Sequence, residues 1–344
     1  MFGRKPGHVT THGERLSAHF RHSGYSVISV SASTNRYVRL VDIVSSLIRH
    51  RNRIDILIVD VYGERSFIVE DISSWLGKRF NKPVVMVLHG GTLPAFMVRF
   101  PRWTNRVLSR ADALITPSDY MARSIIRHGF QPRIIPNMID LSAYPYRHRR
   151  ELNPSLLWMR SFYPYYNPMM AVRVLASLRS KIPEATLIMA GQDDGMLRDV
   201  QKTVRDLGLC DAVRFPGFLD MAGKVREGNA ADVFLNTTNI DNMPVAVVEA
   251  CAMGIPVVST AAGGIPDLVT NGETGLLVPD DDDRAMVEAV HRLLKDPDLS
   301  AHLSANGRRL AERSSWERVR PQWERVFTDV MAPAVKHSYA TTSA

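Results

Sequence analysis

The amino-acid sequence alternates short apolar runs with helix-length amphipathic stretches over most of its length. The apolar runs are rich in Val, Ile and Leu and have no polar face, which is typical of parallel strands that helices cover on both sides. We therefore expect an α/β fold. The expected strands are 25–31, 55–61, 84–88, 113–116, 133–135, 156–160, 185–190, 213–215, 233–236, 256–260 and 275–278.

These strands fall into two groups on either side of residues 144–154, YPYRHRRELNP, which lack periodicity and are expected to be a linker. We expect two doubly wound Rossmann-like domains, an N-terminal one over 1–149 and a C-terminal one over 150–314. Ligands bind outside the carboxyl ends of strands in such sheets, so the two domains are expected to face a shared cleft. A final helix over 315–332 is expected to cross back to the first domain, and 333–344 to form a disordered tail.

The charge of the chain is distributed unevenly between its two halves. Residues 1–150 carry 23 Lys and Arg against 10 Asp and Glu, whereas residues 151–344 carry 20 against 25. The first half therefore suits an anionic partner, such as a phosphorylated substrate or a phospholipid surface. Nucleic acid is the weaker choice, because no recognisable reading motif accompanies the charge.

Other features of the sequence point to a cytoplasmic protein. The apolar runs stop far short of the roughly 18 residues that span a bilayer, and the first residues do not resemble a secretory signal. The only cysteines, Cys210 and Cys251, give no disulfide framework and favour a reducing compartment.

The segment 237–278 carries the clearest functional pattern. Pro244 suits the first turn of a helix and Gly254 the position after its end, so we expect a helix between them. Asp241 would lie just ahead of this helix and Glu249 inside it.

This placement allows a nucleotide to bind at the helix start. The N–H groups near Asn242 and Met243 would be unpaired and would suit a phosphate. The carboxylate of Glu249 would offer two acceptor oxygens to a ribose diol. The alternative is that Asp241 caps the helix and that Glu249 lies on a solvated face.

The spacing of Asp241 and Glu249, followed by ACAMGIPVVSTAAGGIPDLV and NGETGLLV, resembles the carboxy-terminal domain of the retaining family-4 glycosyltransferases (glycosyl transferases group 1), whose signature is Glu-x7-Glu. The resemblance extends over nearly the whole chain, through AGQDDGMLRDVQKTVRDLGLCDAVRFPGF, IIPNMIDL and SSWERV. It implies the GT-B fold, two Rossmann-like domains flanking a deep cleft. It also implies transfer of a sugar from a nucleotide-diphosphate donor with retention of anomeric configuration.

The resemblance assigns roles to individual residues. Glu249 would hold the donor ribose, and Asp241 with the backbone after it would contact the donor sugar and its phosphate. Arg160 would clamp the diphosphate, for which a guanidinium is suited because it donates two parallel hydrogen bonds and stays charged. His89 would approach the reacting sugar. The alternatives are a surface ion pair for Arg160 and a satisfied buried side chain for His89.

Five further positions correspond to loops of the donor site. Gly191 and the turn from Phe215 to Gly217 would line the base and the diphosphate. Gly3 and Gly7 would form the glycine-rich loop that follows the first strand.

The chain departs from the family pattern in three places. A Lys usually follows the family's Arg, whereas RSFYPYYNP after Arg160 contains none. The sequence opens at MFGRKPGH, so the first strand of the N-terminal domain is expected to be incomplete. Asp241 is one methylene shorter than the family's Glu.

The resulting expectation is a metal-independent glycosyltransferase without a cofactor. It would act on a glycan or lipid-linked acceptor in the synthesis of cell-surface polysaccharide or glycolipid. No His, Cys or carboxylate cluster with ligand spacing is evident along the sequence. The alternatives are a catalytically inactive relative that serves as a partner or lipid-binding subunit, and a nucleotide-sugar epimerase.

One segment suggests contact with the inner face of a membrane. The residues from Phe96 to Arg110, FMVRFPRWTNRVLSR, combine Arg with Phe and Trp, as an interfacial segment on anionic lipid does. The alternative is a solvated helix face.

Overall fold

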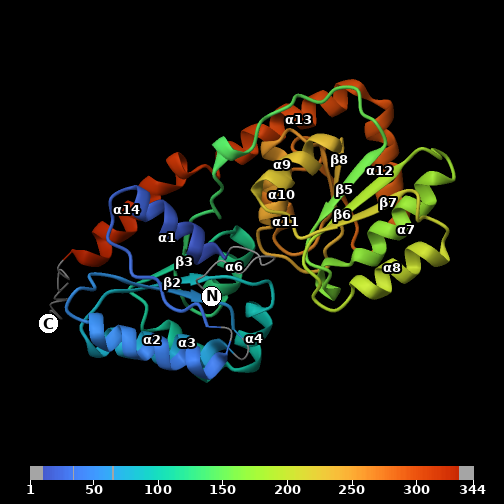
Figure 1. Ribbon diagram of the computed structural model, residues 1–344. Helices are drawn as coiled ribbons and strands as arrows, with labels where there is room; N and C mark the ends of the chain where they lie inside the picture. The colour runs from blue at the N-terminus through green and yellow to red at the C-terminus, as the bar shows by residue number, and fades with distance from the viewer. Residues whose placement is uncertain (1–10, 34, 64–65, 333–344) are drawn as a thin grey trace, which may run out of the picture.

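The computed structural model describes residues 11–33, 35–63 and 66–332 (Figure 1). They form two halves, each built around a parallel sheet with helices on both faces. The expected α/β fold with two Rossmann-like halves is thus confirmed. Two expected features lie outside the described residues. They are the incomplete first strand with the loop of Gly3 and Gly7, at residues 1–10, and the tail over 333–344.

The sheet of the N-terminal half has four strands in the order β1-β2-β3-β4. The strands are β1 (Leu57–Val61), β2 (Val84–Leu88), β3 (Ala113–Thr116) and β4 (Arg133–Ile134). The helices of this half are α1 (His12–His22), α2 (Arg36–His50), α3 (Phe67–Arg79), α4 (Leu93–Arg99), α5 (Pro101–Leu108) and α6 (Asp119–Arg127).

The sheet of the C-terminal half has six parallel strands in the order β10-β9-β8-β5-β6-β7. The strands are β5 (Ser155–Met159), β6 (Thr186–Ala190), β7 (Val213–Gly217), β8 (Val233–Asn236), β9 (Val257–Thr260) and β10 (Leu276–Val278). The helices of this half are α7 (Pro168–Arg179), α8 (Leu197–Asp206), α9 (Met221–Ala230), α10 (Val245–Ala252), α11 (Ile265–Leu268), α12 (Asp283–Lys295) and α13 (Pro297–Glu312), and α14 (Trp316–Met331) follows them in the chain. This strand order is that of a Rossmann fold, in which the direction of winding reverses between β5 and β8.

Alternating residues of each strand supply the two apolar layers of the N-terminal half. In β2, Met86 and Leu88 point into the core beneath α3 to α6, whereas Val85 and Val87 pack with α1. Helix α14 completes this second layer through Val319 and Trp323, so the last helix of the chain lies on the first half, alongside α1 (Figure 1).

The expected strand over 25–31 is not formed. This segment is extended but does not pair with a described strand. Its carbonyl at Val27 instead accepts hydrogen bonds from the Arg21 guanidinium, and Ile28 is 43% exposed. A side chain of α1 thus satisfies the backbone group that a neighbouring strand would have bonded. The other ten expected strands are formed to within two residues at either end.

The segment between the halves has no regular secondary structure after Tyr144, but it is held firmly to the C-terminal half. Arg149 is buried there and donates to the carbonyls of Gly228, Ala231 and Met253. Burial, together with Arg147 nearby, lowers the pKa of Arg149 to about 10.

Among the described residues, no helix combines the length and apolarity needed to cross a membrane.

Candidate functional site

The first group of site residues lies where the winding of the C-terminal sheet reverses. Arg160 directly follows β5, and its backbone N–H donates to Ala190 at the end of β6. Gly191 follows, and a Cβ there would lie 1.8 Å from the carbonyl oxygen of Arg160. Only glycine allows the loops after β5 and β6 to approach this closely. Gly191 also donates its N–H to Gly217 at the end of β7, which brings a third predicted position to the same edge.

Phe215, on β7, contributes to the core rather than to an open loop. Its ring is partly buried against the C-terminal core and lies 6.1 Å from the ring of Phe162. Gly217 has φ +76°, a conformation that glycine adopts readily, and a Cβ there would meet open space.

Arg160 and Asp241 form an ion pair. Arg160 Nη2 lies 2.5 Å from Asp241 Oδ2, and the guanidinium stacks 4.0 Å from the ring centre of Tyr166. Both charged groups are largely buried, at 10% and 14% side-chain exposure, so the alternative of a surface ion pair is wrong. Burial alone would lower the pKa of Arg160, but Asp241 and Tyr166 raise it above its usual value.

The helix expected after Asp241 is formed as α10. Pro244 stands immediately before it, and the chain turns at Gly254, where φ is +73°. The expectation of an unpaired N–H at Asn242 is wrong, because that group donates to Asp241 Oδ1 at 2.7 Å. Asp241 is thus a local acceptor, although it caps no helix end.

Asn242 and Met243 face the N-terminal half. The side chain of Asn242 contacts the hydroxyl of Ser118, and its buried Nδ2 atom has no hydrogen-bond partner among residues 11–33, 35–63 and 66–332. The carbonyl of Met243 accepts from Asn137 Nδ2 at 3.2 Å. These residues connect the two halves next to α10.

Glu249 is buried inside α10 with 1% side-chain exposure, so the alternative of a solvated face is wrong. Lys224 Nζ lies 2.7 Å from both carboxylate oxygens, and Tyr144 Oη donates to Oε1 at 2.8 Å. Arg15, from α1 of the other half, lies 3.3 Å from the same oxygen. Burial alone would raise the pKa of Glu249, but Lys224 and Arg15 lower it below its usual value.

His89 immediately follows β2 and lies at the carboxyl edge of the N-terminal sheet. Its backbone N–H donates to Val61 at 2.7 Å, and its ring stacks on Tyr62 with centroids 5.1 Å apart. The loop after it reaches the other half, since a Cβ on Gly91 would lie 2.6 Å from the side chain of Ile240. The structure therefore places the loop that follows His89 against the segment that carries Asp241.

Comparison with known proteins identifies the family of the chain. Residues 6–143 match the family described as Glycosyltransferase Family 4, and residues 148–310 match Glycosyl transferases group 1. The chain belongs to the family-4 glycosyltransferases. It has their GT-B fold, as the resemblance implied, and its family is one of transferase enzymes.

Individual relatives are distant. The chain is 29% identical over 165 residues to the GDP-mannose-dependent alpha-(1-6)-phosphatidylinositol monomannoside mannosyltransferase of Mycolicibacterium smegmatis, covering 46% of this chain and 43% of the relative. It is 26% identical over 288 residues to the phosphatidyl-myo-inositol mannosyltransferase of Mycobacterium leprae, covering 78% and 73%. The chain spans about half the length of the first curated relatives that it matches.

Among solved structures, HepE of Anabaena in complex with UDP has a TM-score of 0.73 at 17% sequence identity. The likeness covers 91% of this chain and 89% of that one, and it bears on the fold alone.

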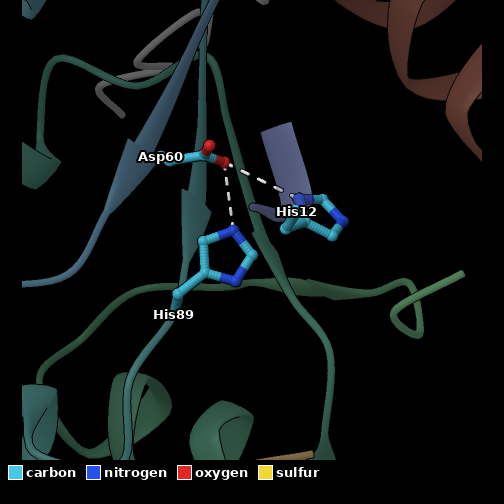
Figure 2. Close-up of side chains that lie close together, drawn as sticks. All are labelled: His12, Asp60 and His89. Atoms are coloured by element: carbon cyan, nitrogen blue, oxygen red, sulfur yellow. Dashed lines mark hydrogen bonds and ion pairs between the residues drawn. The ribbon is translucent and has the colours of Figure 1, made fainter. Parts of the chain in front are cut away.

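Sequence reasoning missed several residues at the site of this family-4 member, among them Arg15 and Lys224 beside Glu249 and, in the N-terminal half, Asp60 and His12. Asp60, in β1, places Oδ1 3.0 Å from His89 Nε2 and 3.7 Å from Nδ1 of His12, the first residue of α1 (Figure 2). Burial lowers the pKa of His12. Burial alone would raise the pKa of Asp60, but the two nearby imidazoles, His89 and His12, hold it below its usual range. An acidic residue inside the apolar run of β1 was the only local signal.

In the segment from Phe96 to Arg110, Phe100 is exposed, at 38%, but the other two aromatic side chains face inward. Phe96 is buried, and Trp103 packs against the same core and donates to Asp71 at 2.7 Å. Arg110 forms an ion pair with the same carboxylate at 2.5 Å. The expected membrane surface is therefore not supported by these side chains.

Proposed function

We propose that this chain is a retaining glycosyltransferase that transfers a sugar from a nucleotide-diphosphate donor to a glycan or lipid-linked acceptor. The observation that carries the proposal is the buried pair of Arg160 and Asp241 where the sheet reverses, with Glu249 in the adjacent helix. This is the place where open α/β sheets bind ligands. The family membership supplies the reaction class.

The donor diphosphate would replace Asp241 as the partner of Arg160. A phosphate takes the same two-donor geometry that a guanidinium offers a carboxylate, so the exchange preserves the hydrogen bonding of Arg160. The stacking of Arg160 on Tyr166 would hold the guanidinium plane in place while its partner changes. Asp241 would then be free to accept from hydroxyls of the donor sugar.

The donor ribose would bind Glu249, and Lys224 would stay beside that carboxylate. Lys224 supplies positive charge at the donor site although the segment after Arg160 contains no lysine. Charge that grows on the departing diphosphate would be stabilised by Arg160 and Lys224, with little reorganisation needed during the reaction.

His89 would lie on the acceptor side of the reacting sugar. Its ring is held by stacking on Tyr62 and by the hydrogen bond with Asp60, so its position is set before the sugar arrives. In this mechanism the leaving phosphate takes the proton from the acceptor hydroxyl, and transfer needs no cofactor or metal ion.

The relatives narrow the donors worth testing. One relative is described as GDP-mannose-dependent and one similar structure holds UDP, so GDP and UDP come first. The phosphatidylinositol-linked acceptors in the relatives' names support a role in cell-surface glycolipid or polysaccharide synthesis. A cytoplasmic enzyme that works at the inner face of a membrane fits such an acceptor.

Binding of the donor nucleotide is the first test. The Tm of the purified parent chain and of the Glu249→Gln variant is measured without ligand and with UDP, GDP, ADP or free phosphate. The substitution keeps the size of the side chain. A ligand at a hundred times its Kd stabilises a protein by about 2.7 kcal/mol, which shifts Tm by several degrees. We expect a shift with one nucleotide that Glu249→Gln abolishes. Glu288→Gln is the matched control, since Glu288 is an exposed helical carboxylate paired with Arg284.

Transfer is then assayed with the donor sugar of the nucleotide that binds, and the anomeric configuration of the product is read by NMR. An absence of stabilisation by every nucleotide contradicts the proposal. Tight binding without turnover favours the inactive relative, and turnover without an acceptor favours the epimerase.

A further inference from the structure

Three side chains from distant parts of the N-terminal half converge beside the proposed reaction site. His12 begins α1, Asp60 lies in β1, and His89 follows β2 (Figure 2). One nitrogen of each histidine and one oxygen of Asp60 all lie within 4.8 Å of one another. Two imidazoles and a carboxylate form a common ligand set for zinc and related transition-metal ions.

We propose that His12, Asp60 and His89 form a binding site for one divalent transition-metal ion, with Zn²⁺ the best fit. The ligands would be Nδ1 of His12, Oδ1 of Asp60 and Nε2 of His89. Three protein ligands leave a fourth tetrahedral position open for water or for an oxygen of a bound substrate.

The distances are close to those that such an ion requires. Ligand atoms bound at about 2.0–2.1 Å around a tetrahedral ion lie roughly 3.4 Å apart. Asp60 Oδ1 already lies 3.0 Å from His89 Nε2 and 3.7 Å from His12 Nδ1. Closing the site therefore requires His12, in the first turn of α1, to move a few tenths of an ångström towards Asp60 and, since the ligand atoms all lie within 4.8 Å of one another, at most about 1.4 Å towards His89.

The surroundings favour an ion over a closed hydrogen-bond network. Within the part of the chain that the structure describes, buried His12 Nδ1 makes no hydrogen bond shorter than 3.5 Å, because Asp60 Oδ1 lies 3.7 Å away; this is costly for a polar atom unless a ligand reaches it. Asp60 retains 21% side-chain exposure, which gives an ion and its water a route of entry. The stacking of His89 on Tyr62 holds one ligand in place beforehand.

Besides the inward movement of His12, binding requires a change of tautomer at His89. In the metal-free state the Nε2 proton of His89 is shared with Asp60, whereas in the metal-bound state that proton resides on Nδ1 and Nε2 binds the ion. Asp60 then exchanges a hydrogen bond for a metal bond. Two nitrogen ligands disfavour Mg²⁺, which prefers oxygen ligands.

The test is direct metal binding by the full chain without an affinity tag, after treatment with a chelator. Zinc chloride is titrated by calorimetry, and cobalt chloride is followed through its visible ligand-field absorption, which is intense for a tetrahedral site. We expect one equivalent of metal per chain. His12→Ala and His89→Ala should each weaken binding by at least about tenfold.

His128→Ala is the matched control, because His128 Nδ1 contacts the Ser124 carbonyl of its own helix and lies outside the cluster. Thermal unfolding without metal confirms that each variant folds. The proposal is overturned if no saturable binding occurs, if both cluster variants bind as tightly as the parent, or if His128→Ala loses binding equally. The proposal would also be overturned if the chain bound Mg²⁺, added as magnesium chloride, but not Zn²⁺.

A second measurement rests on the proposed function. Zinc would occupy the nitrogen of His89, so one equivalent should lower the transfer rate at least tenfold, and EDTA should restore it. If zinc binds at the three residues but leaves transfer unchanged, the role proposed for His89 is contradicted and the metal site stands.

Discussion

Arg15 of the N-terminal half reaches Glu249 of the C-terminal half, with Arg15 Nη2 3.3 Å from Glu249 Oε1. The same oxygen accepts from Tyr144 and Lys224. The carboxylate assigned to the donor ribose is therefore already fully hydrogen-bonded, and one of its partners belongs to the opposite half. Ribose binding at Glu249 thus requires that at least one of these donors withdraw.

Arg15 is the donor expected to withdraw, because its side chain is 24% exposed, whereas that of Lys224 is 18% exposed. Arg15→Gln should then tighten nucleotide-diphosphate binding, by up to about tenfold, since one competing hydrogen bond is worth about 1.5 kcal/mol. Calorimetric titration with UDP and GDP measures this. A weaker affinity in the variant would show that Arg15 binds the diphosphate instead.

Arg160→Lys should weaken nucleotide-diphosphate binding by about 10- to 100-fold, because a lysine keeps the charge but loses the two-donor geometry. Binding of the bare nucleoside should change little, since it carries no phosphate. Arg179→Lys provides the control, as Arg179 pairs with Asp211 at the surface. An equal loss for nucleoside and nucleotide would mean that Arg160 only supports the fold.

Gly191→Ala should destabilise the chain by about 2–4 kcal/mol, because its Cβ would meet the Arg160 carbonyl at 1.8 Å and force the two loops apart. Gly217→Ala meets open space, so the cost should be about 1 kcal/mol from its φ of +76° alone. Urea unfolding of both variants gives the comparison. Equal costs would contradict the close approach of the two loops.

Glu70 gives stability a specific pH dependence. Burial raises the pKa of this carboxyl to about 7 from its usual 4.5, and none of the described residues offers a hydrogen bond to its Oε2. The folded chain therefore keeps a proton that the unfolded chain releases between these pH values. The contribution of Glu70 to the free energy of unfolding is therefore fully present below about pH 4.5. It is lost, by up to about 3 kcal/mol, as the pH rises to 7.

Glu70→Gln removes this titration while keeping an amide hydrogen-bonded in the same place. The free energy of unfolding of the variant, minus that of the parent, should therefore grow from pH 4.5 to pH 7. Above pH 7 the difference should stay constant. Urea unfolding at several pH values provides the data. A difference that does not vary with pH would mean that Glu70 ionises normally in the folded chain.

The sequence by itself determined the features that depend on neighbours along the chain. The β-branched apolar runs predicted ten of the eleven proposed strands, and Pro244 and Gly254 located α10 with Glu249 inside it. These predictions hold because periodicity and the conformational limits of proline and glycine act over a few residues. The run over 25–31 had the same local pattern, but its Val27 carbonyl accepts a hydrogen bond from Arg21, and none of the described strands pairs with it.

Only the tertiary structure decided which distant charges meet. Nothing in the spacing of Arg15 and Glu249, or of His12, Asp60 and His89, indicates that they come together. Their contacts arise because α1 lies across the first sheet towards the second half, and because β1 and β2 end at the same edge. A carboxylate that looked free to bind ribose is therefore paired across the two halves, since long-range electrostatic partners follow from how packed elements are placed in space.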